Sequence, residues 1–172
     1  MSQHIAFGWT QEELACFEHA RKPHNVVMLP GDVTADTLVI LKPTALTRDL
    51  VHEIMRRLYK VGWVVTACKV SVAKDMWMRH YADLAARYGP EVQSDVCDRM
   101  HGCVIVMRMR GRDIVARVRT LIGATNPREA APGTIRADLA WETSYNLIHA
   151  SAVGESEQEL QLWGDILAGD IA

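Results

Sequence analysis

The chain has 172 residues, which is enough for one domain with a single hydrophobic core. Its formal net charge of −2, with 19 basic and 21 acidic residues mixed along the chain, excludes the single-sign field that binds nucleic acid or anionic lipid. The apolar runs are far shorter than the roughly 20 residues of a membrane span, and the first residues show no signal-peptide pattern. Four cysteines without Cys-x-x-Cys spacing indicate reduced thiols rather than structural zinc. We therefore expect a cytoplasmic protein that binds neither membrane nor nucleic acid.

Residues 1–36 are predicted to form an N-terminal extension with one helix. Thr10-Gln11-Glu12-Glu13 matches a capping box, in which the Thr10 hydroxyl accepts from the Glu13 amide and the Glu13 carboxylate accepts from the Thr10 amide. A helix is predicted to follow over residues 11–22, because Pro23 ends it. Its apolar residues are expected to pack on the main domain or on a neighbouring subunit.

The rest of the chain alternates between predicted strands and helices. β-branched and apolar residues predict strands at residues 37–43, 63–72 and 103–109, and a short strand that carries Ile148 and His149. Apolar residues at helical spacing predict helices from Thr47 to Gly62, over 73–88, over 113–122, and near the end of the chain up to Trp163. This order indicates an open sheet with helices packed on it. Periodicity alone leaves both a doubly wound sheet and a split β-α-β arrangement open.

A basic, turn-rich segment from Arg119 to Arg136 precedes the sequence Asn146-Leu147-Ile148-His149-Ala150-Ser151. A neutral imidazole can act as a nucleophile, and arginine forks bind phosphate oxygens two at a time, so these residues suggest anion chemistry. On residue types alone, a lone histidine after two apolar residues is more often part of the core. Arg119, likewise, could pair with a carboxylate or extend along the surface.

Three motifs are more specific: Leu121-Ile122-Gly123-Ala124-Thr125-Asn126-Pro127, Ala130-Ala131-Pro132-Gly133-Thr134-Ile135-Arg136 and Asn146-Leu147-Ile148-His149. Together they resemble nucleoside diphosphate kinases, over roughly residues 37–163. The resemblance implies an α+β domain of residues 37–172, with a ferredoxin-like antiparallel four-stranded sheet covered by helices. It also implies ping-pong transfer of the γ-phosphate from a nucleoside triphosphate to a nucleoside diphosphate through a phosphohistidine.

The resemblance assigns roles to individual side chains. His149 is the expected nucleophile, Glu159 orients its far nitrogen, and Ser151 lies beside it. The expected nucleotide-binding residues are Lys42, Tyr81, Arg119, Thr125, Arg136 and Asn146. No metal-ligand cluster is evident in the sequence, so Mg²⁺ is expected to arrive on the nucleotide phosphates. Family members are tetramers or hexamers built from a common dimer, which implies a homo-oligomer.

Several residues depart from the family pattern. The base-stacking phenylalanine of the family falls near Gly89, the opposing valine or isoleucine becomes Thr143, and Tyr88 could replace the lost ring. Asp49 stands where the family has glycine. Two further hypotheses therefore stay open: the same phosphohistidine chemistry on an unusual nucleoside or metabolite acceptor, and a non-catalytic nucleotide-binding or assembly module.

Overall fold

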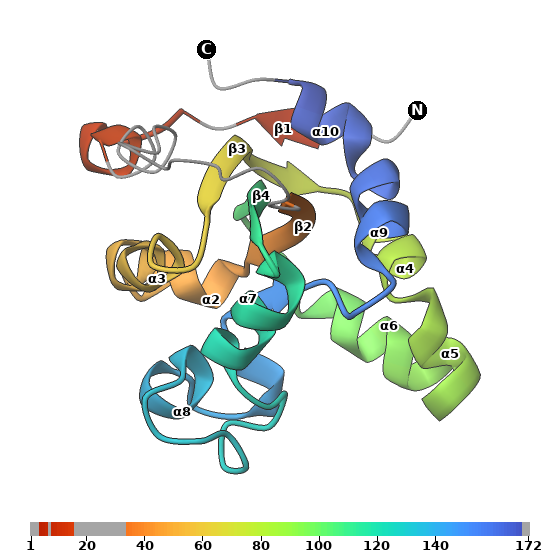
Figure 1. The fold of residues 1–172 in the computed structure, drawn as a ribbon. Coiled ribbons are helices and arrows are strands. Elements are labelled where there is room, and N and C mark those ends of the chain that lie inside the picture. Colours follow the sequence, from red (N-terminus) through yellow and green to blue (C-terminus); the bar gives the residue numbers. More distant parts are fainter. Residues whose placement is uncertain (1–3, 7, 16–33, 170–172) are drawn as a thin grey trace.

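An antiparallel sheet forms the centre of the computed structural model, which describes residues 4–6, 8–15 and 34–169 (Figure 1). The strands lie in the order β1-β3-β4-β2-β5. Their bounds are β1 His4–Ala6, β2 Thr34–Leu41, β3 Trp63–Val72, β4 Val104–Arg112 and β5 Ile148–Ala150. Without the short β1, the order along the sheet is second, third, first and fourth strand of the chain, with every pair antiparallel. This is the ferredoxin-like arrangement, so the predicted fold class is confirmed.

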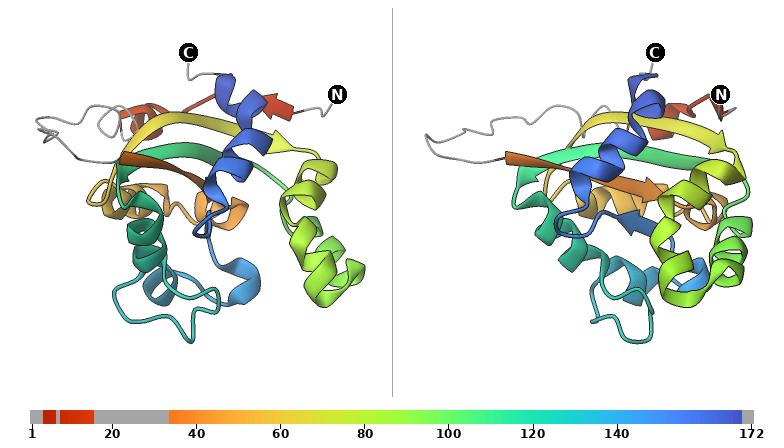
Figure 2. Two further views of the ribbon diagram at one scale, coloured as in Figure 1. Left: turned by 45° about the vertical axis from the view of Figure 1, so that its right-hand side comes forward. Right: turned by 90° about the vertical axis from the view of Figure 1, so that its right-hand side faces the viewer.

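The central strand β2 separates two hydrophobic cores, because its successive side chains point to opposite faces of the sheet. Val39 and Leu41 belong to one core, and Leu38 and Ile40 belong to the other. Helices α2 Pro43–Thr47, α3 Val51–Leu58 and α7 Ile114–Ile122 contribute to the first core, and α4 Lys74–His80 and α10 Gly164–Ala168 to the second. Figure 2 shows α7 beneath the strands, whereas α9 Ser156–Leu162 and α10 cross their other side.

Two helix predictions were wrong in their bounds. The helix expected from Thr47 is the pair α2 and α3, which Asp49 separates with a left-handed backbone at φ +54°. The helix expected over residues 73–88 is divided at Tyr81 into α4 and α5 Ala82–Tyr88. The side chain of Tyr88, the last residue of α5, is 65% exposed.

Helix α6 Pro90–Asp98 was not predicted at all. Gly89-Pro90 signalled the end of one helix, but Pro90 also occupies the first turn of the next, where a missing amide hydrogen is tolerated. The loop before β5 contains the short helix α8 Ile135–Leu139 and the 3-10 helix η1 Thr143–Tyr145.

The N-terminal segment lies along β3, the edge strand of the four-stranded part of the sheet. β1, which was not predicted, pairs with Val70–Val72. The predicted capping box is confirmed: the Thr10 amide donates to Glu13 Oε2 at 2.9 Å, and the Glu13 amide donates to Thr10 Oγ1 at 3.1 Å. Residues 11–15 are helical, and the remainder of the predicted helix lies outside the described residues. Glu13 also forms an ion pair with Lys69 at 2.7 Å, which joins the segment to the sheet.

The remaining features of the fold concern an ion-pair cluster at Asp36, the cysteine thiols and the length of the helices. Arg108 and Arg110 both pair with Asp36, whose side chain is largely buried. The cysteines of the described segments, Cys68, Cys97 and Cys103, are free thiols, and burial raises the pKa of each. Within the described ranges, no helix is both long and apolar enough to cross a membrane.

Candidate active site

The candidate site begins at a left-handed turn just before β5. Leu147 has φ +67° although its side chain is fully buried, a backbone conformation that costs on the order of 1–3 kcal/mol for a residue of this kind. The Lys42 amide donates to the Leu147 carbonyl at 2.8 Å and holds the turn in place. The Lys42 ammonium group donates to Asn146 Oδ1, also at 2.8 Å. The end of β2 and the start of β5 are therefore joined through both backbone and side chains.

His149 in β5 is held by a carboxylate from α9. His149 Nε2 lies 3.0 Å from Glu159 Oε2, and Ser151 Oγ donates to the same oxygen at 2.6 Å. Burial raises the pKa of Glu159, but the hydrogen bonds from His149 and Ser151 outweigh it, so this pKa lies below its ordinary value. An ionised carboxylate can only accept, so Nε2 of the neutral ring carries the hydrogen and Nδ1 keeps its lone pair. This is the protonation state of a nucleophile.

Lys42 is the first cation near this ring. It is partly buried, and its pKa falls to about 7 because of burial and, second, because of the charge of Arg136. The Lys42 nitrogen lies 5.9 Å from the centroid of the Tyr81 ring, which in turn lies 6.3 Å from the His149 ring.

The two predicted phosphate-binding arginines occupy different environments. Arg136 is only 7% exposed and donates to the carbonyls of Ile148 at 2.6 Å, Gly123 at 3.1 Å and Asn146 at 3.3 Å. Burial lowers the pKa of Arg136 to about 10. Arg119 is exposed, and its Nη1 lies 3.4 Å from the Ala150 carbonyl. The two guanidinium groups thus contact the residues on either side of His149.

Tyr81 and Thr125 complete the predicted set. Among the described residues, four buried side-chain polar atoms lack a partner, and three of them belong to neighbouring residues of α4 and its end: Trp77 Nε1, His80 Nε2 and Tyr81 Oη. Burial raises the pKa of Tyr81, so its hydroxyl remains a donor. Thr125 joins the site through its carbonyl, which accepts from Asn146 Nδ2 at 3.4 Å. All nine predicted site residues therefore belong to one connected group.

The wall expected to hold a base is open. Gly89 has φ +93°, and a Cβ atom placed there would meet nothing within 4 Å. Thr143 in η1 is exposed. The buried side chain of Gln93, which sequence reasoning missed, donates to the carbonyls of Met78 at 2.7 Å and Tyr81 at 3.1 Å and fixes the α4–α5 junction. Its sequence signal was hidden, because the helix that carries it was not predicted.

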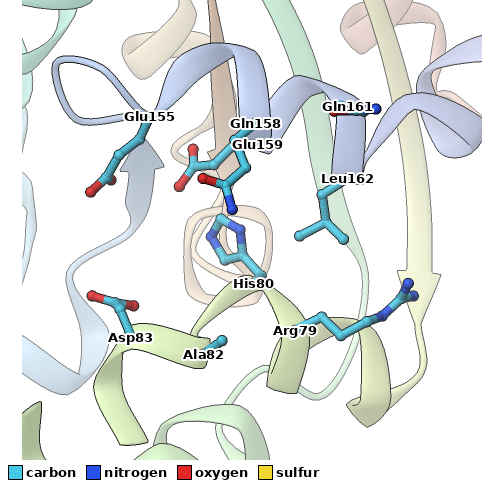
Figure 3. Close-up of a pocket in the computed structure, with 9 residues that line it drawn as sticks. All are labelled: Arg79, His80, Ala82, Asp83, Glu155, Gln158, Glu159, Gln161 and Leu162. Atoms are coloured by element: carbon cyan, nitrogen blue, oxygen red, sulfur yellow. The ribbon is translucent and has the colours of Figure 1, made fainter. Parts of the chain in front are cut away.

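A separate cavity of about 390 Å³ reaches the same carboxylate from another direction. Figure 3 shows Glu159 of α9 and His80 of α4 facing each other in it. Lys42, Arg119 and Arg136 do not line this cavity, whereas Arg79 does. His80 was not among the predicted site residues, although its place next to Tyr81 could have drawn attention to it.

Comparisons with known proteins identify the family of this chain. A family model described as nucleoside diphosphate kinase matches residues 35–165. Nucleoside diphosphate kinase 1 of Spinacia oleracea is 41% identical over 129 residues, which cover 74% of this chain and 86% of that protein. Nucleoside diphosphate kinase 3 of Homo sapiens is 40% identical over 131 residues, which cover 74% of this chain and 75% of that protein.

Solved structures show the same similarity. A halophilic nucleoside diphosphate kinase from Halobacterium salinarum, in complex with CDP, superposes with a TM-score of 0.71 at 30% identity and covers 76% of this chain and 88% of that one. The enzyme from Encephalitozoon cuniculi gives a TM-score of 0.69 at 33% identity, over 74% of this chain and 87% of that one. Since the matching region includes the four-stranded part of the sheet, the loop before β5 and α9, the chain belongs to the nucleoside diphosphate kinase family.

Proposed function

We propose that this chain transfers the γ-phosphate of a nucleoside triphosphate to a nucleoside diphosphate through a phosphohistidine at His149. The lone pair of Nδ1 forms a bond to the γ-phosphorus, and the bond from phosphorus to the bridging oxygen breaks, so the electron pair leaves with the diphosphate. An acceptor diphosphate oxygen then attacks the phosphorus, and the electron pair of the N–P bond returns to Nδ1. The observation that supports this most is the 3.0 Å contact between His149 Nε2 and the ionised Glu159, because it leaves Nδ1 as the free nitrogen.

The cations are proposed to hold the transferred group. Phosphoryl transfer needs positioning and charge stabilisation more than bond-making. Arg119 presents an exposed guanidinium fork, whereas Arg136 commits three of its donors to carbonyls and contributes charge and its remaining N–H groups. Lys42 supplies a point charge, and the unpartnered hydroxyl of Tyr81 can donate to a phosphate oxygen. Asn146 and Thr125 are proposed to contact the nucleotide as the family resemblance implies.

Mg²⁺ is proposed to enter as part of the substrate. The side chains around His149 are mainly cations and neutral donors, with Glu159 committed to His149 and Ser151, so the described site offers no carboxylate cage of the kind that holds this ion. When bound with the nucleotide, the ion would neutralise part of the phosphate charge. The residues of this chain then bind the remaining oxygens.

The direct test is incubation with Mg²⁺ and ATP, followed by measurement of intact mass. We expect one added phosphate that is labile to acid, and no addition in His149→Ala. His52→Ala is the matched control, because His52 is exposed on α3, away from the site, and this variant should be labelled like the parent protein. An unchanged mass after exposure to ATP would refute the proposal.

A second candidate keeps the phosphohistidine but directs it to an unusual nucleoside or metabolite acceptor. The open wall at Gly89 and the exposed Thr143 favour it, because base stacking contributes roughly 1–3 kcal/mol in comparable nucleic-acid sites. A panel of acceptors separates the two, since ordinary diphosphates should discharge the labelled protein under the first proposal. Binding of ATP without label transfer would instead support a non-catalytic nucleotide-binding or assembly module.

Residues 1–36 are proposed to be an extension attached to a catalytic domain of residues 37–172. β1 and the Glu13–Lys69 ion pair attach the described part to β3. Removal of residues 1–15 should therefore leave the phosphorylation of His149 intact while it exposes the edge of β3.

The protein is further proposed to be a homo-oligomer, a tetramer or hexamer built from a dimer, as the family resemblance implies. Light scattering on the full chain tests this directly. A monomeric mass at micromolar concentration would overturn it.

A further inference from the structure

His80 is a buried side chain for which the proposed reaction has no role. It is 8% exposed and lies at the C-terminal end of α4. Its ring centroid is 4.4 Å from that of His149, with the planes at 80°, and 4.6 Å from that of Tyr81. His80 thus touches the proposed nucleophile edge-on and faces Glu159 across the cavity of Figure 3.

The hydrogen bond from Trp163 determines which nitrogen of His80 carries the hydrogen. The indole Nε1–H can only donate, and it donates to His80 Nδ1 at 3.2 Å. Burial lowers the pKa of His80 to about 3, so the ring is neutral. A neutral imidazole that accepts at Nδ1 must carry its hydrogen at Nε2. His80 therefore presents an N–H group at the nitrogen that has no hydrogen-bond partner.

This tautomer argues against a metal at the same place. His80, His149 and Glu159 each offer a ligand atom within 4.8 Å of the others, which is compatible with a bound ion. A metal would need the lone pair of His80 Nε2, and the hydrogen would then move to Nδ1, where it would face the indole N–H. Two donors facing each other in a buried site are unfavourable. The arrangement suits a donor near a carboxylate better than a ligand.

We propose that Trp163 locks His80 as an Nε2–H donor, and that His80 in turn is a positioning residue for His149. The edge of the His80 ring packs against the His149 ring and opposes the rotation that would exchange Nδ1 and Nε2. Nε2 of His149 then stays on Glu159, and Nδ1 stays available for phosphate. The kinetic part of this inference rests on the proposed function, whereas the tautomer of His80 does not.

The chain offers a matched pair of variants, Trp163→Phe and Trp77→Phe. Both indoles are almost fully buried in the same core, with ring centroids 5.1 Å apart. Trp163 Nε1 donates to His80, but Trp77 Nε1 has no partner, so only the first substitution removes a hydrogen bond. A purely structural role for Trp163 predicts similar effects from both.

Two readouts are needed: the nitrogen NMR shifts of the His80 imidazole and the single-turnover rate of phosphorylation by Mg²⁺-ATP. We expect the Nε2–H tautomer alone in the parent protein and in Trp77→Phe, and a mixture in Trp163→Phe. By analogy with outer partners of metal-binding histidines, the phosphorylation rate should fall about tenfold in Trp163→Phe and about 10–100-fold in His80→Ala, which removes the ring that packs on His149. Nucleotide affinity should stay within about twofold, because neither residue lies in the phosphate-binding group.

His80→Ala also carries the test if Trp163→Phe does not fold, and the double variant should be no slower than His80→Ala alone. Equal rates for Trp163→Phe and Trp77→Phe, or an Nδ1–H signal from His80 in the parent protein, would overturn the proposal. If the parent protein takes no phosphate from ATP, the proposed function fails together with the positioning role. The nitrogen NMR shifts would then still test separately whether Trp163 fixes the Nε2–H tautomer of His80.

Discussion

Arg119 and Arg136 look equivalent in the sequence, but the structure predicts that the removal of Arg136 lowers stability far more than the removal of Arg119. Arg136→Met leaves the carbonyls of Ile148 and Gly123 without this donor, whereas the Asn146 carbonyl keeps the Ile148 amide at 2.8 Å. A buried acceptor that loses its partner costs about 1–3 kcal/mol, so the total loss in the free energy of unfolding should be about 3–5 kcal/mol. Arg119→Met removes an exposed side chain with one long contact, and about 0.5 kcal/mol or less is expected.

These losses in the free energy of unfolding predict clearly different melting temperatures for the two variants. For a chain of this size, 1 kcal/mol shifts Tm by about 2–4 °C, so Arg136→Met should melt about 6–20 °C lower and Arg119→Met within about 2 °C of the parent protein. Circular dichroism melts measure both. Phosphoryl transfer should be assayed at a temperature at which both variants are folded. There, Arg119→Met should lose about 10²–10³-fold in turnover, the typical effect of removing a preorganised donor to transition-state charge.

The comparison has clear refuting outcomes. Equal melting temperatures for the two variants would contradict the structural assignment of Arg136. Normal turnover in Arg119→Met would remove the exposed fork from the proposed phosphate site. Arg128→Met is the control, because Arg128 is also an exposed arginine, in the loop that follows α7, and it should change neither quantity.

Three further predictions concern Lys42, Ser151 and Asp49. The pKa of Lys42 lies at about 7, below its ordinary value, so its contribution to the free energy of unfolding rises as pH increases through 7. A bound triphosphate favours the charged form, so calorimetry at pH 8 in buffers of different ionisation enthalpy should show proton uptake, which Lys42→Met abolishes. Ser151→Ala leaves the Leu38 amide without its side-chain partner and Glu159 Oε2 with His149 alone, and urea unfolding should show a loss of about 1–3 kcal/mol. Asp49→Gly relieves a left-handed backbone and should raise stability by about 1 kcal/mol in the same assay, whereas a loss would show that Asp49 is not strained.

The fold was predictable where the apolar pattern was long and regular. Residues 63–72 read as a strand from their β-branched content and form β3 with those bounds. The breaks at Asp49 and Tyr81 were missed because both interrupt a run of apolar residues that continues at helical spacing on either side. β1 was missed because its three residues carry no alternating pattern, and only pairing with β3 makes them a strand.

The sequence predicted which residues form the site, but not how deeply each side chain is buried or which groups it contacts. The motifs around Arg136 and His149 identified the cationic side chains, and the structure joins them to Glu159 and Ser151. Sequence could not separate the buried Arg136 from the exposed Arg119, because that difference depends on carbonyls contributed by β5 and the preceding loop. The tautomer of His80 depends on Trp163, 83 residues away in the chain.

Three locally unfavourable features occur together at this site. Leu147 holds a left-handed backbone, Tyr81 buries a hydroxyl without an acceptor, and Lys42 is a partly buried cation beside Arg136. Each feature destabilises the free protein, and a polyanion would relieve two of them, because it supplies acceptors for Tyr81 and opposite charge for Lys42. The strain at Leu147 has no such remedy, so it persists only while the Lys42 amide and the buried side chain hold the turn. The binding free energy of a phosphate group is therefore more favourable here than at a site without such groups. The Tyr81 hydroxyl and the Lys42 charge are unfavourable in the free protein and are satisfied only when the phosphate binds.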